Sequence, residues 1–312
     1  MTAVELGRLP PIGPAVVTLG VFDGVHLGHR QVLTATAEAA RRHDAAPVAL
    51  VFSPHPDEVL RPGTEVPRLL PPALTLERIG ALGIRPLEVR FDDALRSCTP
   101  EDFLGRLGPA LDLRAVTMTR DSAFGKGRAG TLDRVRQIGA EAGFEAIGVE
   151  PAAADGAPVS SSRIRSLLAA GDVGATTRLL AGPPLLRGTV VHGDRRGRLL
   201  GYPTANLRFD YRAAMPALGI YLGRVHVPAR DVGPGHPALV SVGVRPTFED
   251  DGRVLVEAFL LDWDGDLYDA ELDVELVARL RDELRFESAE ALVEQMRRDE
   301  EDARRLVAAE GA

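Results

Sequence analysis

Cysteine, lysine and long apolar runs are nearly absent from this chain of 312 residues. The single cysteine, Cys98, has no partner for an internal disulfide, which is typical of proteins in a reducing cytoplasm. No stretch approaches the roughly 20 apolar residues that a membrane-spanning helix needs. The opening residues MTAVELGRLP lack the basic and apolar regions of a secretory signal. We therefore expect a cytoplasmic protein without a membrane partner.

Positive charge is in deficit, because 37 lysines and arginines stand against 45 acidic residues, a net charge of -8. This balance argues against a general nucleic-acid binder, so no nucleic-acid partner is expected. All but one of the basic residues are arginine. The exception, Lys126, lies in the glycine-rich string FGKGRAG, where a compact ammonium could meet a phosphate. A solvated loop lysine would explain the same position.

Apolar runs alternate with helical patterns through the first half of the chain. The runs expected to form buried strands are 16–21, 47–52, 87–91, 115–119 and 146–149. The segments expected to form helices are one opening near Gly28 and those at 74–83, 100–107 and 131–142. Strands and helices that alternate at this spacing predict an α/β fold with a doubly wound parallel sheet.

The stretch at 15–33, AVVTLGVFDGVHLGHRQVL, combines a strand, a turn and the start of a helix. His26 and His29 are one helical turn apart, so both imidazoles can face one anion. Gly28 between them leaves the backbone open to a ligand. The free N–H groups and the dipole of the helix start suit a phosphate. An ordinary turn with two surface histidines is the alternative.

Two further segments of the first half carry candidate binding groups. His55 stands between prolines directly after the strand at 47–52, and loops at this edge of a parallel sheet bind ligands. A structural histidine in a proline turn is the alternative. The string VSSSRIR, at 159–165, starts a helix with hydroxyls and two arginines, which suits a triphosphate. Ordinary helix capping explains the serines equally well.

The pattern changes after a boundary near 181–184, AGPP. Short apolar runs separated by glycine, proline and aspartate predict an antiparallel β-barrel, followed by a helix at 288–308 with Ser288 as its cap. In the string GYPTAN, Thr204 and Asn206 alternate and point the same way on an extended backbone. A hydroxyl and an amide oxygen on one face can hold Mg²⁺ beside nucleotide phosphates, although a simple turn is also possible.

Glu257 is a lone carboxylate in the apolar string VLVEAFLLD. Burying such a group is costly, so a carboxylate on an apolar strand is often functional, here as a general base. A salt-bridged glutamate on an edge strand is the alternative.

The string GVFDGVHLGH, with the histidine-x-glycine-histidine signature of nucleotidyltransferases, resembles the first module of the prokaryotic bifunctional riboflavin kinase/FAD synthetases. The strings GTVVHGDRRGRLLGYPTAN, GIYLG, SVGVRPTF, VEAFLLDWDGDLY and LRDELRF resemble, in this order, the riboflavin kinase module. The resemblance spans almost the whole chain. It implies an FMN adenylyltransferase (FAD synthetase) domain at 1–182 and a riboflavin kinase domain at 183–312. The implied substrates are riboflavin, FMN and ATP with Mg²⁺, and the products are FMN and FAD.

The resemblance also assigns residues to each reaction. In the first module it implies catalytic roles for His26, His29 and Arg165. The ATP-binding residues that it implies there are Gly20, Phe22, Asp23, Gly24, His26, Gly28, His29, Ser161, Ser162 and Arg165. The implied flavin-binding residues are His55, Asp121, Phe124 and Lys126. In the second module it implies that Gly201, Pro203, Thr204 and Asn206 bind ATP and Mg²⁺, with Thr204 and Asn206 as metal ligands. Glu257 would take the proton of the riboflavin 5′-hydroxyl.

Two strings depart from the family pattern. Thr119 and Ser122 stand in TRDSAFG where a glycine and an aromatic residue are usual, and Val244 and Arg245 stand where threonine and asparagine are usual. Two rival hypotheses therefore accompany the bifunctional enzyme. One is a kinase whose first module is weak, silent or altered in specificity, and the other is a non-catalytic flavin-binding regulator. The oligomeric state is left open.

Overall fold

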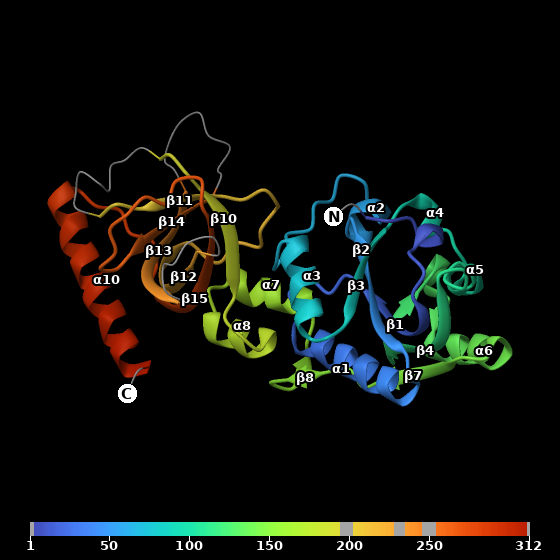
Figure 1. Cartoon of the computed structure of the whole chain (residues 1–312). Coiled ribbons are helices and arrows are strands. Elements are labelled where there is room, and N and C mark those ends of the chain that lie inside the picture. Colours follow the sequence, from blue (N-terminus) through green and yellow to red (C-terminus); the bar gives the residue numbers. More distant parts are fainter. Residues whose placement is uncertain (1–2, 194–201, 228–234, 245–253, 311–312) are drawn as a thin grey trace. The chain divides into compact units, whose positions relative to one another are not determined.

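In the computed structural model, which describes residues 3–193, 202–227, 235–244 and 254–310, the chain forms two compact units (Figure 1). The first unit comprises Met1–Val66 and Pro71–Ser161. The second comprises Pro67–Leu70 and Ser162–Ala312, so a short segment from the first half of the chain packs with the second half. In that segment, the backbone N–H of Arg68 donates to the carbonyl of Arg212 at 2.8 Å.

A five-stranded parallel sheet, in the order β3-β2-β1-β4-β7, forms the centre of the first unit. Its strands are β1 (Gly13–Gly20), β2 (Ala46–Ser53), β3 (Arg85–Arg90), β4 (Leu111–Thr119) and β7 (Glu145–Val149). The order reverses between β1 and β4, which is the switch point where doubly wound sheets bind ligands beyond the carboxyl ends of their strands. The predicted fold class of the first half is confirmed.

Helix α1 (Leu27–Arg42) covers one face of the sheet, packing against β1, β2 and β4. Its small residues Ala39 and Ala40 are buried in one cluster with Val16 and Ala115 of the sheet. Short side chains let a helix approach a sheet closely, because little volume separates the two backbones. The start of α1 is thereby fixed directly beyond the end of β1.

The opposite face of the sheet carries the larger core of the first unit, in which Val17, Leu50 and Val116 of the strands pack with Phe103 and Leu107. The remaining helices of this unit are η1 (Leu6–Arg8), α2 (Pro56–Leu60), α3 (Pro72–Ala81), α4 (Asp93–Arg96), α5 (Pro100–Gly105), η2 (Lys126–Arg128) and α6 (Leu132–Ala142). Burial of both faces explains why the strands appear in the sequence as continuous apolar runs.

A closed antiparallel barrel forms the second unit, with strands in the order β10-β11-β14-β13-β12-β15. Its strands are β10 (Leu185–Val191), β11 (Ala205–Arg208), β12 (Gly219–His226), β13 (His236–Val244), β14 (Val254–Leu260) and β15 (Glu271–Arg281). The helices α7 (Ser161–Ala169) and α8 (Val173–Leu180) precede it. The predicted barrel is confirmed, and closure leaves none of these strands with an open edge.

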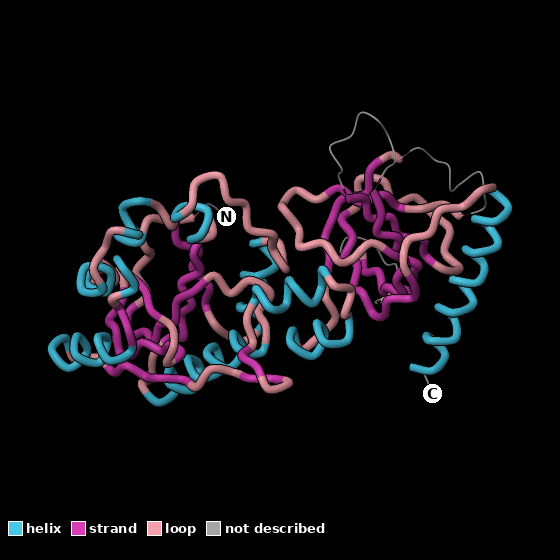
Figure 2. The backbone as a smooth tube through the Cα atoms, turned by 180° about the vertical axis from the view of Figure 1, so that it is seen from behind, coloured by secondary structure: helices cyan, strands magenta, loops and turns pink. Residues whose placement is uncertain are grey.

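Helix α10 (Ala289–Glu310) runs along one side of the barrel, as the views from the front and from behind show (Figures 1 and 2). The hydroxyl of Ser288 accepts a hydrogen bond from the N–H of Ala291 at 3.2 Å, so the predicted cap is confirmed. Ala303, fully buried, is the contact point of α10 with the barrel cluster of Leu222, Leu239 and Leu261.

The residue pattern missed several short elements. They are the helices α2, α4 and α8 and the two-stranded hairpins formed by β5 (Ala123–Phe124) with β6 (Gly130–Thr131) and by β8 (Ala153–Ala154) with β9 (Ala157–Pro158). Strands of two residues and helices of one or two turns are too short to show a periodicity.

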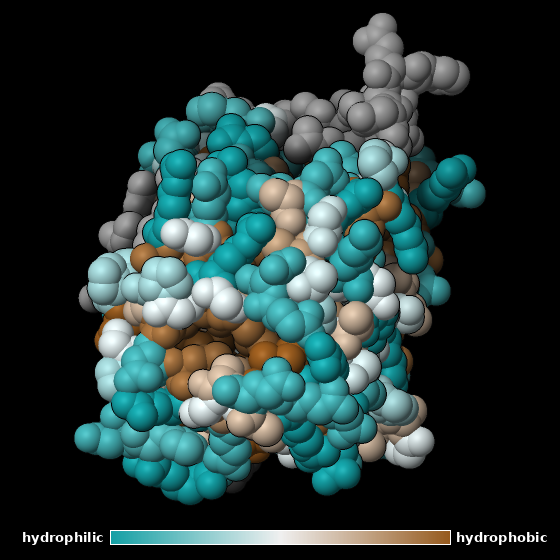
Figure 3. All heavy atoms as spheres, turned by 90° about the vertical axis from the view of Figure 1, so that its right-hand side faces the viewer, coloured by the Kyte–Doolittle hydropathy of each residue, from teal (hydrophilic) through white to brown (hydrophobic). Residues whose placement is uncertain are grey.

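Hydrophilic side chains surround one apolar hollow on the face seen in Figure 3, as expected for a chain in which charged residues make up 26%.

Candidate functional sites

The loop between β1 and α1 has an unusual backbone. Phe22, Gly24 and Val25 adopt positive φ angles of 56°, 84° and 42°. Such angles are costly for a β-branched residue like valine. The N–H of Val25 donates to the carbonyl of Phe22 at 2.9 Å, and both side chains are buried, which holds the turn in place. Strain of this kind concentrates at ligand-binding turns.

His26 is the N-cap of α1, and its Nδ1 accepts a hydrogen bond from the backbone N–H of His29 at 3.3 Å. Because Nδ1 accepts, a neutral His26 carries its proton on Nε2, an assignment that follows from this hydrogen bond. The residue is 4% exposed. The cap therefore fixes both the orientation and the tautomer of the ring at the positive end of the helix dipole.

The rings of His26 and His29 stack, with centroids 3.6 Å apart and planes inclined by 16°. Phe22 approaches His29 edge-on at 5.3 Å. The predicted pairing of the two imidazoles on one side of the helix is confirmed. Burial, and secondly the charge of His26, hold the pKa of His29 well below its ordinary value, so His29 is neutral at pH 7. Its Nδ1 has no hydrogen-bond partner within the described ranges.

This lowered pKa predicts a pH-dependent stability. In the folded chain His29 stays neutral where an unfolded histidine, with a pKa of about 6.5, takes up a proton. The unfolded state thus binds more protons below that pKa, and the free energy of unfolding falls with decreasing pH by at most about 1.4 kcal/mol per pH unit. Urea unfolding of wild type and His29→Gln, at about pH 7.5 and about pH 5.5, measures this loss. Equal losses in both proteins would contradict the prediction.

Gly28 lies against the ring of His26. A Cβ at this position would stand 3.2 Å from Cε1 and 3.3 Å from Nδ1 of His26, and 3.5 Å from the carbonyl oxygen of Val159. A side chain here would crowd the His26 imidazole, whereas its distance from the Val159 carbonyl would be an ordinary van der Waals contact. Glycine at this position therefore spares the His26 ring a tight contact, in addition to leaving the backbone open as the sequence predicts.

His55, after β2, is the N-cap of α2. Its Nδ1 accepts from the N–H of Asp57 at 3.1 Å, while the carboxylate of Glu58 accepts from the backbone N–H of His55 at 3.2 Å. This reciprocal capping box gives His55 a structural role, which is the alternative reading of its proline turn. A contact of His55 with flavin stays a prediction.

The loop after β4 carries the three other predicted flavin residues, and they differ in their exposure to solvent. Asp121 and Lys126 are exposed, so both charges are open to solvent and to ligands. Phe124 is 8% exposed and its ring lies 5.0 Å from that of Phe103, so core packing accounts for its side chain. At the departure from the family pattern, the hydroxyl of Ser122 donates to the carbonyl of Thr119 at 2.8 Å and closes the turn.

The start of α7 holds the predicted triphosphate residues. The hydroxyl of Ser161 donates to the carbonyl of Asp23 at 3.0 Å and ties the helix start to the loop after β1. A guanidinium N–H of Arg165 donates to the hydroxyl of Ser162 at 3.3 Å, and another donates to the carbonyl of Pro67 at 3.4 Å. Ser162 and Arg165 belong to the second compact unit. The association of Arg165 with the histidine pair stays a prediction.

Three polar residues form a row across the barrel. Asn206 on β11 and Ser241 on β13 are the register partners of Glu257, on either side of β14. Side chains opposite each other on neighbouring strands have Cβ atoms about 4.5–5.5 Å apart. Thr204 adds a hydroxyl that donates to a Glu257 carboxylate oxygen at 3.5 Å. The structure thus brings Glu257 together with Thr204 and Asn206.

Gly193 closes the site against Asn206. A Cβ at Gly193 would lie 2.5–2.7 Å from the side-chain amide of Asn206, so a larger residue there would require this amide to move. Pro203 is exposed next to this row. Gly201 and Arg245, which the sequence also singled out, lie outside the described residues.

Ser241 is the functional candidate that the sequence analysis missed. It is half-buried and directly opposite Glu257, yet its place in the row depends on the pairing of β13 with β14. A signal existed in the sequence, because Ser241 is a hydroxyl within the apolar run ALVSVGV. Only the register tells which of many such hydroxyls faces the carboxylate.

The described residues contain no cluster of three or more histidine, cysteine or acidic side chains that would hold a metal by itself. The hydroxyl and amide oxygens beside Glu257 are a different kind of donor set. Mg²⁺ commonly takes one or two protein oxygens and completes its shell with water and phosphates. The row in the barrel therefore fits Mg²⁺ bound together with a nucleotide, although it does not resemble an all-protein metal cage.

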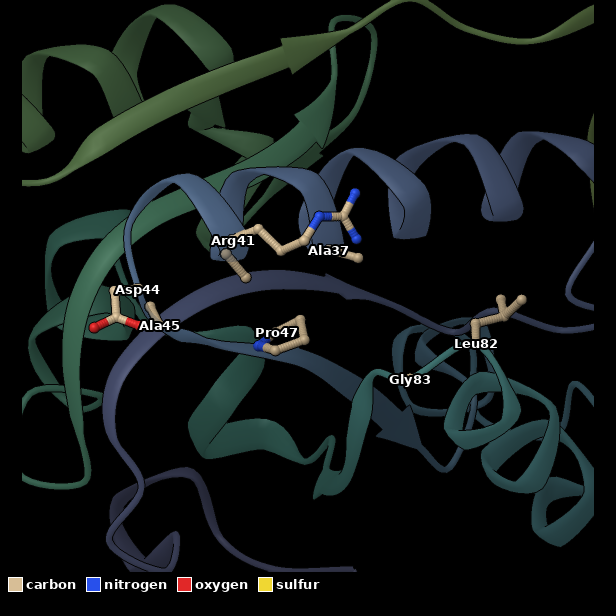
Figure 4. A pocket seen from close by; sticks show the side chains of 8 residues that line it. Ala37, Arg41, Asp44, Ala45, Pro47, Leu82 and Gly83 are labelled. Carbon is tan, nitrogen blue, oxygen red and sulfur yellow. The ribbon is translucent and has the colours of Figure 1, made fainter.

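A surface pocket of the first unit lies away from these motifs. Its lining residues are Ala37, Ala40, Arg41, Asp44, Ala45, Pro47, Leu82 and Gly83 (Figure 4). They come from the end of α1, the start of β2 and the turn after α3. This is the edge of the sheet where β2 begins, opposite to the carboxyl edge where α/β sheets bind ligands.

None of the helices in the described ranges has the length and apolar character to cross a bilayer.

Comparison with known proteins gives a consistent result for both halves of the chain. Residues 11–163 match the FAD synthetase family and residues 180–307 match the riboflavin kinase family. The chain is 37% identical to the bifunctional riboflavin kinase/FMN adenylyltransferase of Pseudomonas fluorescens over 295 residues, which cover 94% of this chain and 93% of the relative. It is 32% identical to the protein of the same description from Listeria monocytogenes, covering 94% and 92%.

A solved structure also matches the whole chain. The crystal structure of a protein described as a macrolide-efflux protein from Streptococcus pneumoniae superimposes with a TM-score of 0.87 at 30% identity. The match covers 96% of this chain and 97% of that one. The arrangement of a parallel sheet followed by a barrel and a helix thus occurs in a known structure over the full length.

Proposed function

The chain belongs to the family of bifunctional riboflavin kinase/FMN adenylyltransferases, and we propose from this premise that it makes FMN from riboflavin and then FAD from FMN. The match to the FAD synthetase family ends at residue 163 and the match to the riboflavin kinase family begins at 180. These limits support a functional division near 182/183, between α8 and β10. The compact units divide earlier, after Ser161, because α7 and α8 pack with the barrel unit.

The kinase reaction is proposed to take place at the row in the barrel. Glu257 accepts the proton of the riboflavin 5′-hydroxyl as that oxygen forms a bond to the γ-phosphorus of ATP and ADP leaves. The observation that carries this assignment is the contact of Glu257 with Thr204 at 3.5 Å and its register pairing with Asn206. A base and phosphate-binding groups on one face of a rigid barrel supply the positioning that phosphoryl transfer requires.

We propose that Thr204 and Asn206 hold Mg²⁺ with the ATP phosphates, since both offer hard oxygen donors beside a carboxylate. When bound, the cation neutralises charge on the transferred phosphate. The absence of a side chain at Gly193 leaves room for the Asn206 amide, because a Cβ there would lie 2.5 Å from its nitrogen.

The adenylyl transfer is proposed to take place at the start of α1. A phosphate oxygen of FMN forms a bond to the α-phosphorus of a second ATP, and pyrophosphate leaves. The Nε2–H of His26 and the neutral ring of His29 face this charge from the positive end of the helix, and Arg165 is proposed to bind the leaving pyrophosphate. The stacked imidazole pair is the observation that carries this assignment. Asp121 and Lys126 remain the proposed flavin-binding charges.

One assay tests the proposal against its rivals. Purified protein is incubated with riboflavin, ATP and Mg²⁺, and FMN and FAD are separated by chromatography. Both products are expected. FMN alone would support a kinase with a silent first module, for which the departures at Thr119 and Ser122 give a reason. Neither product would support a flavin-binding regulator. A cytoplasmic location stays a prediction.

Gly28→Ala is expected to slow FAD formation from supplied FMN about tenfold, because the new methyl group displaces the His26 ring from the helix start. FMN formation from riboflavin should not change. The rates of both reactions, measured on the same preparation, check this result.

Gly80→Ala is the matched control for Gly28→Ala. Gly80 lies within helix α3, and a Cβ there meets nothing within 4 Å. Alanine in this position should preserve both rates, since it only adds helix propensity. A slow adenylyl transfer in both variants would assign the effect to glycine replacement in general.

A further inference from the structure

Tyr202 is the anchor of the segment that carries Thr204 and Asn206. It is 7% exposed, whereas Pro203 next to it is exposed and Thr204 is half-buried. The ring of Tyr202 meets the ring of Phe259 edge-on, with centroids 5.0 Å apart at 62°. Tyr202 is buried and Phe259 is half-buried, and an edge-on contact between two such rings favours one placement of the Tyr202 side chain.

Phe259 connects this contact to the general base. It follows Glu257 by two positions on β14, so both side chains lie on the same face of the strand. On β13, Leu239 is the register partner of Phe259 and Ser241 is the register partner of Glu257. Tyr202 therefore contacts β14 at Phe259, two residues from Glu257 and on the same face of the strand. Thr204, two residues after Tyr202, contacts Glu257 itself.

Phe259 also packs against the cluster that holds α10 on the barrel. Phe259 belongs to the apolar cluster around Ala303 of α10, together with Leu239 of the barrel. The phenol of Tyr202 also faces the charges of this helix, because Glu300 adds to the effect of burial in raising its pKa while Arg297 opposes it. Phe259 thus connects the two, because it contacts the ring of Tyr202 and packs against the cluster of α10.

A buried ion pair fixes the helix in register with the barrel. The guanidinium of Arg281, at the end of β15, donates two hydrogen bonds to Asp299, at 2.8 and 2.7 Å. Asp299 is 4% exposed and accepts a third hydrogen bond from Gln295 at 2.9 Å. A bidentate pair in this surrounding allows α10 little freedom to slide or rotate.

We propose that Tyr202 is a positioning residue of the kinase reaction, through which α10 and Phe259 hold the Thr204–Asn206 segment against Glu257. The proposal rests on the proposed kinase site. Tyr202 touches none of the reacting atoms, and its effect is to keep the phosphate-binding groups within reach of the base. Misplacement of about 1 Å in such a site can cost a hundredfold in rate.

Tyr202→Leu tests the anchor, because leucine keeps an apolar side chain and removes the aromatic edge contact. We expect kcat for FMN formation to fall about ten- to hundredfold per folded molecule, with the KM for riboflavin little changed. FAD formation from supplied FMN should stay at the wild-type rate. Tyr202→Phe keeps the ring and should restore most of kcat. Wild-type kcat in Tyr202→Leu, or equal losses in both variants, would overturn the proposal.

A double-mutant cycle separates positioning from loss of stability. Phe259→Leu removes the other ring, so the double variant should be no slower than the slower single variant. Multiplying losses would overturn the proposal. Val225→Ala, in the fully buried interior of β12, destabilises the barrel by a cavity and should keep the rate per folded molecule. This control also keeps the test valid where Tyr202→Leu lowers the yield of folded protein.

Asp299→Asn tests the contribution of the helix. It should lower kcat in the same direction as Tyr202→Leu, whereas Asp302→Asn should not, because the pair of Asp302 with Arg305 is at the exposed surface of α10. Wild-type kcat in Asp299→Asn would overturn the role of α10. Failure of the underlying kinase site would instead appear as full FMN formation by Glu257→Gln, whichever way the Tyr202 variants behave.

Discussion

Glu257→Gln is expected to lower FMN formation from riboflavin by about 10²- to 10⁴-fold, the range typical of a lost general base. Glutamine preserves the size of the side chain and its place in register with Asn206 and Ser241, and it cannot accept the proton of the attacking hydroxyl. FAD formation from supplied FMN should proceed at the wild-type rate, because that reaction is assigned to the first module. Both rates are measured by chromatography of the flavins on one preparation.

Glu275→Gln provides the control for Glu257→Gln. Glu275 is also a half-buried glutamate on a barrel strand, and it lies on β15, where its register partners are Leu185 and Arg224. Its replacement should leave both rates unchanged. A loss of FMN and FAD formation together in folded Glu257→Gln would contradict the assignment of two separate ATP sites to one chain.

His26→Asn is expected to lower FAD formation from FMN by about 10²- to 10³-fold, the effect of removing a preorganised donor from a developing negative charge. Asparagine is a good N-cap, so α1 retains an acceptor for the N–H of His29. The substitution therefore separates the imidazole from its structural role. FMN formation should not change.

The other end of the same helix offers the matched control. His43 is the C-cap of α1, and its Nε2 lies 3.0 Å from a carboxylate oxygen of Glu145. His43→Asn removes an imidazole from this helix without touching its start, and asparagine is well tolerated at a helix end. Equal losses of FAD formation in His26→Asn and His43→Asn would show that the helix, and not the His26 imidazole, is what matters.

Local pattern was sufficient for most of the fold. The β-branched run in β1 is buried on both faces, and the periodic apolar residues of α1 face the sheet, so each element carries its own signal. Turns rich in glycine and proline marked the strands of the barrel in the same way. Elements of two to five residues, such as β5 and α2, had no such signal.

Pairs close in sequence were also predictable. His26 and His29 are separated by one turn of a helix whose start the sequence indicates, and their rings stack in the structure. Thr204 and Asn206 alternate on one strand start, so their common face follows from chain geometry. For His55, local chemistry left two readings open, and the capping box shows that its Nδ1 is engaged by the backbone of Asp57.

The sequence by itself determined the order of the longer strands and helices, the two-part organisation and most residues of both sites, because these depend on interactions between near neighbours along the chain. Only the tertiary structure decided that Ser241 stands opposite Glu257, that Tyr202 rests on Phe259, and that 67–70 packs with the barrel unit. Strand register and the docking of α10 join residues that lie far apart in sequence. Their pairing is selected by shape and charge in the folded core, and no local pattern records it.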